Sequence, residues 1–145
     1  MSEIPSISIE EEVMFYDTDC GGVVHNIAYL RMIEKARTKL ATLMGMALRE
    51  MASTHLFPVV VRTEIDYKKP AMLGDVLIIS GSLTGLQGPR FWVNFEIRRA
   101  GKDDLLITCR QSLALVQMPA GRPQRLPAIW AQQWPTLVMA KVKPD

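Results

Sequence analysis

Cysteine is scarce in this 145-residue chain, which contains only Cys20 and Cys109. Two cysteines do not make a disulfide framework, and no cysteine or histidine pair has the spacing of a zinc site. Long apolar runs are also missing, because the longest, 57–61 and 76–79, fall far below the ~20 residues of a membrane span. We therefore expect neither a bound metal nor a membrane-spanning segment.

An excess of charge of one sign is missing as well. The chain has 17 Lys and Arg against 15 Asp and Glu, a formal net charge of +2. Nucleic-acid binding favours strongly basic stripes, so we expect no nucleic-acid partner. The first twelve residues have neither a basic region nor an apolar stretch of the kind found in signal peptides. These absences predict a soluble, cytoplasmic protein.

The composition is that of a folded protein, with 48% hydrophobic and 22% charged residues. This is too apolar for a disordered chain, and the length suits one domain. We therefore expect a single domain over 1–145. Its core should span about residues 10–127, followed by a tail that begins as an irregular stretch at 119–127 and adds a helical turn at 128–134.

The residue pattern predicts one strand, one long helix and then four strands. A short strand is expected at 12–16, followed by a turn-rich loop at 17–22. Asn26 is a plausible N-cap for a helix over 27–44, and a further short helical piece is expected at 47–52. The helix should present one apolar face because apolar residues recur at steps of three and four. They are Leu30, Ile33, Ala36, Leu40 and Leu43.

From Pro58 the hydrophobic period changes to two, which is typical of strands. The strands are expected at 58–67, 76–86, 91–98 and 105–116. In the first of them one face should carry Val59, Val61, Thr63, Ile65 and Tyr67. One helix with such a meander predicts an α+β domain in which the helix covers one face of a five-stranded antiparallel sheet. An oligomer would cover apolar surface that remains.

The segment 15–29 has the composition of a reactive site. Asp17 and Asp19 lie in a glycine-containing loop directly ahead of a helix start. A helix N-terminus presents unpaired N–H groups and about half a positive charge, which can polarise a carbonyl and stabilise an oxyanion. A carboxylate on the other side could attack that carbonyl or activate a water. The alternative is that both aspartates only hydrogen-bond the loop.

Several motifs together resemble the hot-dog-fold acyl-CoA thioesterases. The similarity extends from Val13 to Pro127 and is greatest to the 4-hydroxybenzoyl-CoA thioesterase type, including the thioesterase associated with the Tol-Pal system. It rests on Asp17-Thr18-Asp19, Gly21-Gly22-Val23-Val24, Tyr29-Leu30 and Glu34-Lys35-Ala36-Arg37, and on residues 57–61, 66–71 and 73–75.

This resemblance implies a long central helix wrapped by a curved antiparallel sheet, and dimers or homotetramers with active sites at the dimer interface. It implies Asp19 as the catalytic carboxylate, acting as nucleophile or as general base. Backbone N–H groups around His25, Asn26 and Ile27 would hold the thioester carbonyl, and no metal or organic cofactor would be needed. Substrate contacts are implied for Tyr29 and, through CoA phosphates, for Arg90, Lys68 and Lys69.

One departure concerns the residues after Val23-Val24. The Tol-Pal-associated branch has Tyr-His there, whereas this chain has His25-Asn26. The Asn26-to-Tyr29 spacing instead resembles fatty acyl thioesterases, so the acyl class stays open. Asp17 is expected to be a loop former, and His55 a surface residue. Glu34 and Arg37 form an expected intrahelical pair. Cys20, beside Asp19, is an alternative nucleophile near His25.

The leading hypothesis is therefore an acyl-CoA thioester hydrolase that releases a free acid and CoA. A first alternative keeps the fold but changes the substrate to an acyl-carrier-protein thioester or an aromatic thioester of the hydroxybenzoyl or dihydroxynaphthoyl type. A basic surface near Arg122 and Arg125 would favour the carrier protein. A second alternative is a non-catalytic acyl-CoA-binding oligomer.

Overall fold

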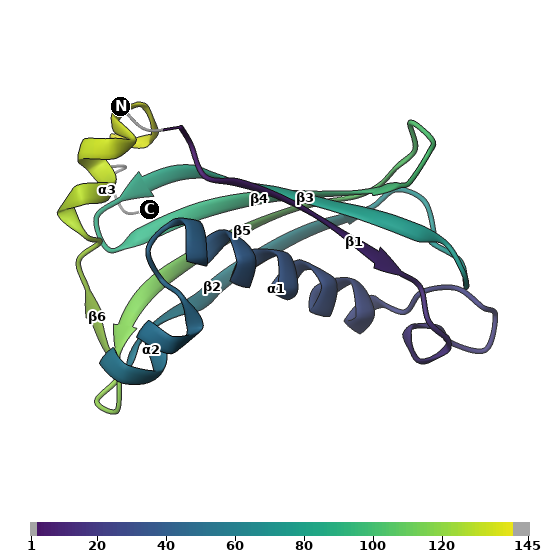
Figure 1. Ribbon diagram of the computed structural model, residues 1–145, viewed down its shortest axis with the longest axis horizontal. Coiled ribbons are helices and arrows are strands. Elements are labelled where there is room, and N and C mark those ends of the chain that lie inside the picture. The colour runs from purple at the N-terminus through teal and green to yellow at the C-terminus, as the bar shows by residue number, and fades with distance from the viewer. Residues whose placement is uncertain (1–2, 141–145) are drawn as a thin grey trace.

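The computed structural model describes residues 3–140 as a long helix lying against a curved antiparallel sheet (Figure 1). This confirms the α+β architecture. The elements in chain order are β1 (Ser6–Glu12), a 3-10 turn η1 (Phe15–Asp17), α1 (Asn26–Leu43), α2 (Leu48–Thr54), β2 (Leu56–Tyr67), β3 (Val76–Gln87), β4 (Arg90–Arg99), β5 (Leu105–Gln117), β6 (Arg122–Gln124), α3 (Ala128–Gln133) and η2 (Pro135–Leu137).

The main path of the sheet has the strand order β1-β3-β4-β5-β2. β3, β4 and β5 form consecutive antiparallel hairpins, while β1 and β2 occupy the two edges. The four strands expected after the helix are thus present as β2 to β5, and the fifth strand is β1, which lies earlier in the chain than expected. A short sixth strand, β6, pairs with the end of β5.

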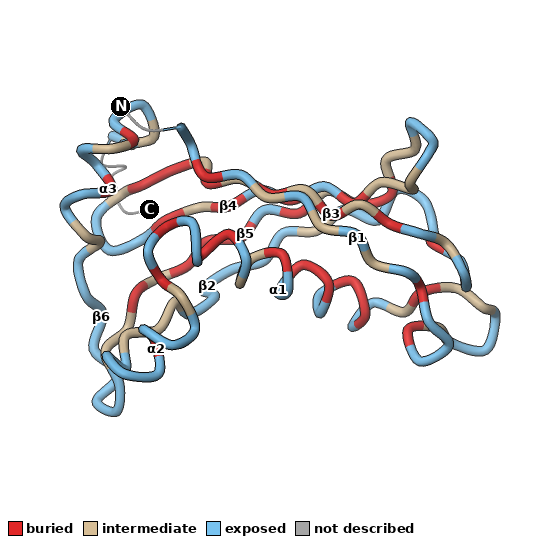
Figure 2. The backbone as a smooth tube through the Cα atoms, in the orientation of Figure 1, coloured by how far each residue is buried: buried red, intermediate tan, exposed pale blue. Residues whose placement is uncertain are grey.

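The core lies between α1 and the facing side of the sheet, as the buried stretches in Figure 2 show. Alternation along β4 is as expected, since Phe91, Val93, Phe95 and Ile97 are buried. The apolar face of α1 differs in part from the prediction because Leu30 and Leu43 are exposed. The buried positions of α1 are Ala28, Tyr29, Met32, Ile33, Ala36, Leu40 and Ala41.

Two boundary predictions near the start of the chain were wrong. The first strand is β1, and the segment expected as a strand at 12–16 turns into η1 instead. Its tight turn is stabilised because the Asp17 carboxylate accepts a hydrogen bond from the Met14 backbone N–H at 3.0 Å. The N-cap of α1 is His25 and not Asn26, since His25 Nδ1 accepts from the Ala28 N–H at 3.1 Å.

A β-bulge in β2 corrects the predicted face of that strand. Val60 pairs with Leu113, but Arg62 pairs with the next residue, Ser112, so Val61 is an extra residue. The bulge reverses the alternation, because side chains point to opposite faces at each step of a strand. Val59 therefore lies on the face opposite to Ile65. The far edge of β2 has no partner strand among residues 3–140.

The C-terminal part is more ordered than expected, because the stretch expected to be irregular at 119–127 contains β6. The helical turn expected at 128–134 is α3. The chain then returns to the sheet, where the Met139 N–H donates to the Leu86 carbonyl at 2.8 Å. Gly85 leaves room for the Met139 side chain, because a Cβ there would force the flexible Met139 sulfur to shift. None of the helices in residues 3–140 is long and apolar enough to span a membrane.

Candidate active site

Asp17 anchors the inner part of the loop between β1 and α1. Its side chain is buried, and its second oxygen accepts from Arg31 Nη2 at 3.1 Å. Arg31 also pairs with Glu11 on β1 at 3.4 Å. Both oxygens of Asp17 are therefore engaged, one by the Met14 N–H and one by Arg31, so this residue holds the loop as expected.

Asp19 lies in the outer part of the same loop and is exposed to solvent. Its backbone N–H donates to the Val23 carbonyl at 3.0 Å, and its carbonyl accepts from Gly22, whose φ of 71° suits glycine. One carboxylate oxygen accepts from the Gly21 N–H at 3.2 Å. The other accepts no hydrogen bond from residues 3–140. Asp19 is thus a fixed carboxylate with an oxygen available to a ligand.

The loop leads directly into the N-terminus of α1. Besides capping through Nδ1, His25 lies with Nε2 3.3 Å from the Tyr16 carbonyl oxygen. Since a carbonyl only accepts, Nε2 is the donor in this contact, and the ring is held between two backbone groups. The backbone N–H groups of Asn26 and Ile27 have no acceptor within residues 3–140. Two donors at the positive end of the helix dipole are therefore available to an anion.

Two tyrosines surround this helix start. Tyr67, at the end of β2, donates its hydroxyl hydrogen to Asn26 Oδ1. Tyr29 accepts from the Ala71 N–H at 2.9 Å, and the two rings lie 5.9 Å apart. Burial raises the pKa of both hydroxyls above their ordinary value, so both remain protonated near neutral pH. With its oxygen engaged, the Asn26 amide has its N–H groups free to donate.

A small cavity of about 270 Å³ opens beside these groups. It is lined by Val23, Val24, Tyr29, Tyr67, Lys68, Lys69 and Pro70. The structure therefore brings the predicted residues Tyr29, Lys68 and Lys69 together next to the start of α1. Lys69 Nζ is 2.8 Å from Asp104 Oδ1, whereas Lys68 has no ion-pair partner within residues 3–140.

Arg90 is not part of this group within one chain. β3 starts beside the Asp19 loop, since the Val13 N–H donates to the Asp75 carbonyl at 2.8 Å. Arg90 follows the far end of β3, and a twelve-residue strand spans about 35 Å. Only a second chain could bring an Arg90 close to Asp19.

The other predicted candidates have less support. Cys20 is exposed, but both nitrogens of His25 face backbone groups, so this histidine is not placed to take a thiol proton. His55 is exposed and ends α2, as expected of a surface residue. Glu34 and Arg37 pair at 3.6 Å.

Sequence reasoning missed three site or support residues. It did not single out Tyr67 or Arg31, nor Gln111, whose side-chain oxygen accepts from Arg37 at 2.8 Å. An available signal for Tyr67 was an aromatic residue at a strand end, directly before Lys68-Lys69-Pro70. No group of three or more His, Cys, Asp or Glu within residues 3–140 is placed to hold a metal ion.

The family model of the thioesterase-like superfamily matches residues 13–134. A 1,4-dihydroxy-2-naphthoyl-CoA hydrolase from Synechocystis is 27% identical over 126 residues, covering 86% of this chain and 91% of the relative. The acyl-CoA thioester hydrolase YbgC from Escherichia coli is 28% identical over 120 residues, covering 79% and 85%.

Solved structures agree with these sequence matches. A probable thioesterase from Bartonella henselae superimposes with a TM-score of 0.77 at 31% identity. The alignment covers 84% of this chain and 99% of that structure. A 1,4-dihydroxy-2-naphthoyl-CoA thioesterase from Synechocystis superimposes with a TM-score of 0.76 at 26% identity, covering 91% and 94%.

Proposed function

The chain belongs to the thioesterase-like superfamily of thioester hydrolases, and from that membership we propose that it hydrolyses acyl-CoA thioesters with Asp19 as the catalytic carboxylate. The observation that carries the proposal is one juxtaposition. The loop of the exposed carboxylate of Asp19 leads into a helix start where the N–H groups of Asn26 and Ile27 have no acceptor within residues 3–140.

The helix start supplies the electrostatic part of the reaction. A thioester carbonyl that accepts hydrogen bonds from the Asn26 and Ile27 N–H groups becomes more electrophilic. The negative charge that develops on its oxygen is stabilised by these donors and by the helix dipole. Tyr67 keeps the Asn26 amide oxygen occupied, so the amide N–H groups remain available as a further donor to the thioester oxygen.

Asp19 supplies the chemical step in one of two ways. As a nucleophile it forms a C–O bond to the acyl carbon, and the C–S bond breaks to give a mixed anhydride and the CoA thiolate. The thiolate takes a proton from water, and a water molecule then hydrolyses the anhydride. As a general base it takes a proton from the water that attacks the same carbon, after which the C–S bond breaks and the CoA thiolate leaves and takes up that proton. Both routes give a carboxylic acid and CoA, and neither uses a metal or an organic cofactor.

The CoA moiety needs cations near the cavity. Of the two lysines that line it, Lys68 has no ion-pair partner within residues 3–140, while Lys69 is engaged by Asp104. Tyr29 forms part of the cavity wall against the substrate. Arg90 would contribute to phosphate binding only from a neighbouring subunit.

We propose a homodimer, or a pair of dimers, because Arg90 would reach the site only from a second chain and because the edge of β2 is open. Val59, Val60 and Val61 on this edge are 43%, 37% and 47% exposed, and unpaired strand edges favour association with a second strand. Val61→Lys should shift the molecular mass measured by light scattering toward one chain. Ile129→Lys, at an exposed site on α3, serves as the control and should leave the mass unchanged.

The substrate class is best determined with a thiol-release assay on purified protein. We expect hydrolysis of at least one member of a panel of short, long and aromatic acyl-CoA thioesters. Aromatic substrates are the second candidate, since a relative is named for 1,4-dihydroxy-2-naphthoyl-CoA. If only acyl-carrier-protein thioesters are hydrolysed, the substrate carrier is the acyl-carrier protein and not CoA. Tight acyl-CoA binding without thiol release would support the non-catalytic oligomer and refute the proposal.

We also propose a cytoplasmic location. Cys20 is an exposed free thiol and Cys109 a buried one, and free thiols persist in reducing compartments.

A further inference from the structure

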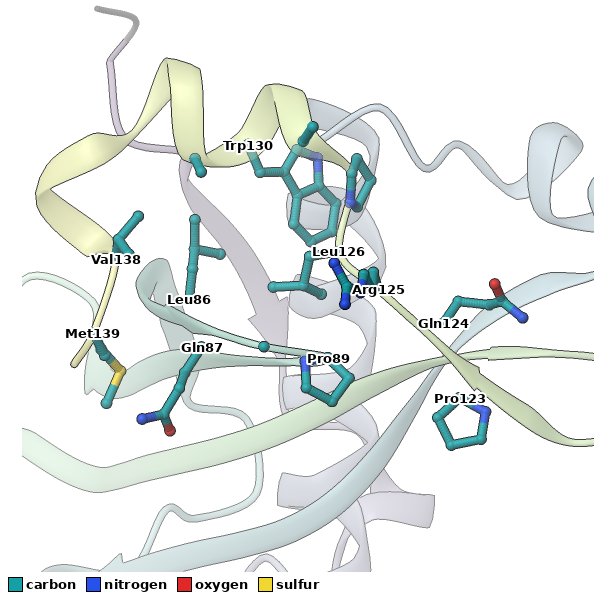
Figure 3. Close-up of a pocket in the computed structure, with 14 residues that line it drawn as sticks. Leu86, Gln87, Pro89, Pro123, Gln124, Arg125, Leu126, Trp130, Val138 and Met139 are labelled. Carbon is teal, nitrogen blue, oxygen red and sulfur yellow. The ribbon is translucent and has the colours of Figure 1, made fainter. Parts of the chain in front are cut away.

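A second concavity lies at the opposite end of α1 from Asp19. This groove has a volume of about 760 Å³, within the usual range of ligand pockets. It lies between the β3–β4 hairpin on one side and β6, α3 and the C-terminal segment on the other (Figure 3). The eighteen residues of α1 separate it from the Asp19 loop by about 27 Å along the helix axis.

The walls of the groove are mainly apolar and well supported. Trp130 forms one wall, and its indole N–H donates to the Met44 carbonyl at 3.0 Å, just beyond the end of α1. Phe91 packs edge-on against the same ring with centroids 5.4 Å apart. On the other side, Val138 bridges Leu86. These contacts show that the groove is already shaped and has a rigid aromatic side.

Arg125 gives this apolar groove one charged group. It is the one cation in the lining, which contains no carboxylate. Arg125 is exposed, makes no ion pair within residues 3–140, and directs its guanidinium toward the middle of the groove beside Leu126 (Figure 3). The sequence from 105 to 144 contains no Asp or Glu at all. A negative ligand would therefore find an unneutralised partner there.

We propose that the groove binds an amphipathic monocarboxylate, with its head on Arg125 and its aliphatic tail along Trp130 and Leu86. A planar carboxylate matches the two parallel N–H donors of a guanidinium, and the apolar walls suit a hydrocarbon tail. A phosphate dianion is a poorer fit because the lining supplies a single cation. The other polar side chains are the neutral amides of Gln87 and Gln124.

This site is separate from the residues that carry the proposed hydrolysis. The superfamily match ends at residue 134, whereas Val138 and Met139 in the wall lie beyond it. The proposal therefore concerns a feature built partly outside the matched domain. It does not depend on Asp19, so a failure of the hydrolysis proposal leaves it standing and can be told apart from its own failure.

Calorimetric titration of the full chain with decanoate tests the proposal. Decanoate should bind, and decyltrimethylammonium, which has the same tail and the opposite charge, should bind at least ~10-fold more weakly. Arg125→Gln should weaken decanoate binding by ~10-fold or more. Arg122→Gln is the matched control, an exposed arginine three positions away outside the lining, and should change the affinity less than ~2-fold.

A second variant locates the bound tail. Ala131 is an exposed residue of α3 that lines the groove, so Ala131→Trp should fill it and abolish decanoate binding, while Ile129→Trp, on the same helix outside the lining, should leave binding unchanged. Circular dichroism checks that each variant is folded. The proposal is overturned if Arg125→Gln binds as the wild type does, if the cationic probe binds equally well, or if Ala131→Trp still binds.

Discussion

The loop before α1 has an inner half, residues 14–18, and an outer half, residues 19–24, and each contains one aspartate. In the inner half Asp17 is buried, with its oxygens held by Met14 and Arg31. In the outer half Asp19 is exposed and is held through one oxygen, by the Gly21 N–H. The same side chain therefore stabilises the loop in one half and is available for chemistry in the other.

Under the proposed function, position and not residue type separates the two roles. A buried carboxylate whose two oxygens are both engaged is not presented to a substrate, and its removal leaves the partners unsatisfied. An exposed carboxylate fixed by a single backbone donor keeps its reactivity and is oriented. If the comparison is right, substitutions in the outer half should reduce turnover, whereas those in the inner half should reduce stability.

The largest effect is expected for Asp19→Asn. Turnover of the best acyl-CoA substrate should fall by at least ~10²-fold, because loss of the carboxylate removes the nucleophile or base. The midpoint of thermal unfolding should stay within a few degrees of the wild type, since Asp19 makes one exposed side-chain hydrogen bond. Undiminished turnover in a rapid-mixing thiol assay would show that another group performs the step.

Asp17→Ala should lower the free energy of unfolding by about 2 kcal/mol, because it leaves the Met14 N–H and Arg31 without their buried acceptor. Urea denaturation measures this directly. Glu11→Ala removes the half-buried carboxylate that Arg31 shares with Lys35 and is the control, with a smaller expected loss because both of its cations are largely solvated. Equal losses of unfolding free energy in the two variants would show that the burial of Asp17 adds no stability.

Tyr67→Phe should reduce kcat by about 3- to 10-fold with little change in KM, since it removes one hydrogen bond that orients Asn26. Tyr16→Phe is the control, because the exposed Tyr16 hydroxyl has no partner within residues 3–140. Asn26→Ala should reduce kcat by a smaller factor in the Tyr67→Phe background than in the wild type. Full additivity would show that the two residues act independently.

The smallest effect concerns the two cysteines, which differ in burial as the two aspartates do. Burial raises the pKa of the Cys109 thiol to about 11. The unfolded thiol loses its proton near pH 8.5. The folded state binds the proton more tightly, so Cys109 should destabilise the fold progressively between about pH 8.5 and 11.

Urea midpoints across this range measure the effect. The midpoint of Cys109→Ala should depend less on pH than that of the wild type. Cys20→Ala, at an exposed site, should keep the wild-type slope. An identical slope in Cys109→Ala would assign the pH dependence to other groups.

Much of the fold could be predicted because its signals are periodic. The apolar alternation of β4 and the three- and four-residue steps of α1 both follow from side-chain geometry along a single element. The bulge at Val61 could not be predicted in this way, because it depends on which residue of β5 stands opposite. The first strand was misplaced because Asp17 closes a turn through a contact with Met14 that no periodicity reveals.

The candidate site was predicted in part for a similar reason. One motif contains four of its residues, because they lie close together in sequence: Asp19, His25, Asn26 and Ile27. Tyr67 is 41 positions from Asn26, and only the packing of β2 beside the start of α1 brings the two together. Arg90 was grouped with the site by resemblance, but the length of β3 separates it from Asp19 within one chain.

The strand order β1-β3-β4-β5-β2 also has a consequence for when the parts of the molecule take shape. Both edge strands are made before the strands that pair with them. β2 ends at Tyr67, and its partner β5 is complete only at Gln117, which is about 3–10 s later at ordinary rates of synthesis. The Asp19 loop has its backbone partners at residues 71–75, so they are made well before β5, and β2 is the element that waits longest for its partner. Limited proteolysis of nascent chains stalled before and after β5 has left the ribosome should show protection of β2 only in the longer ones.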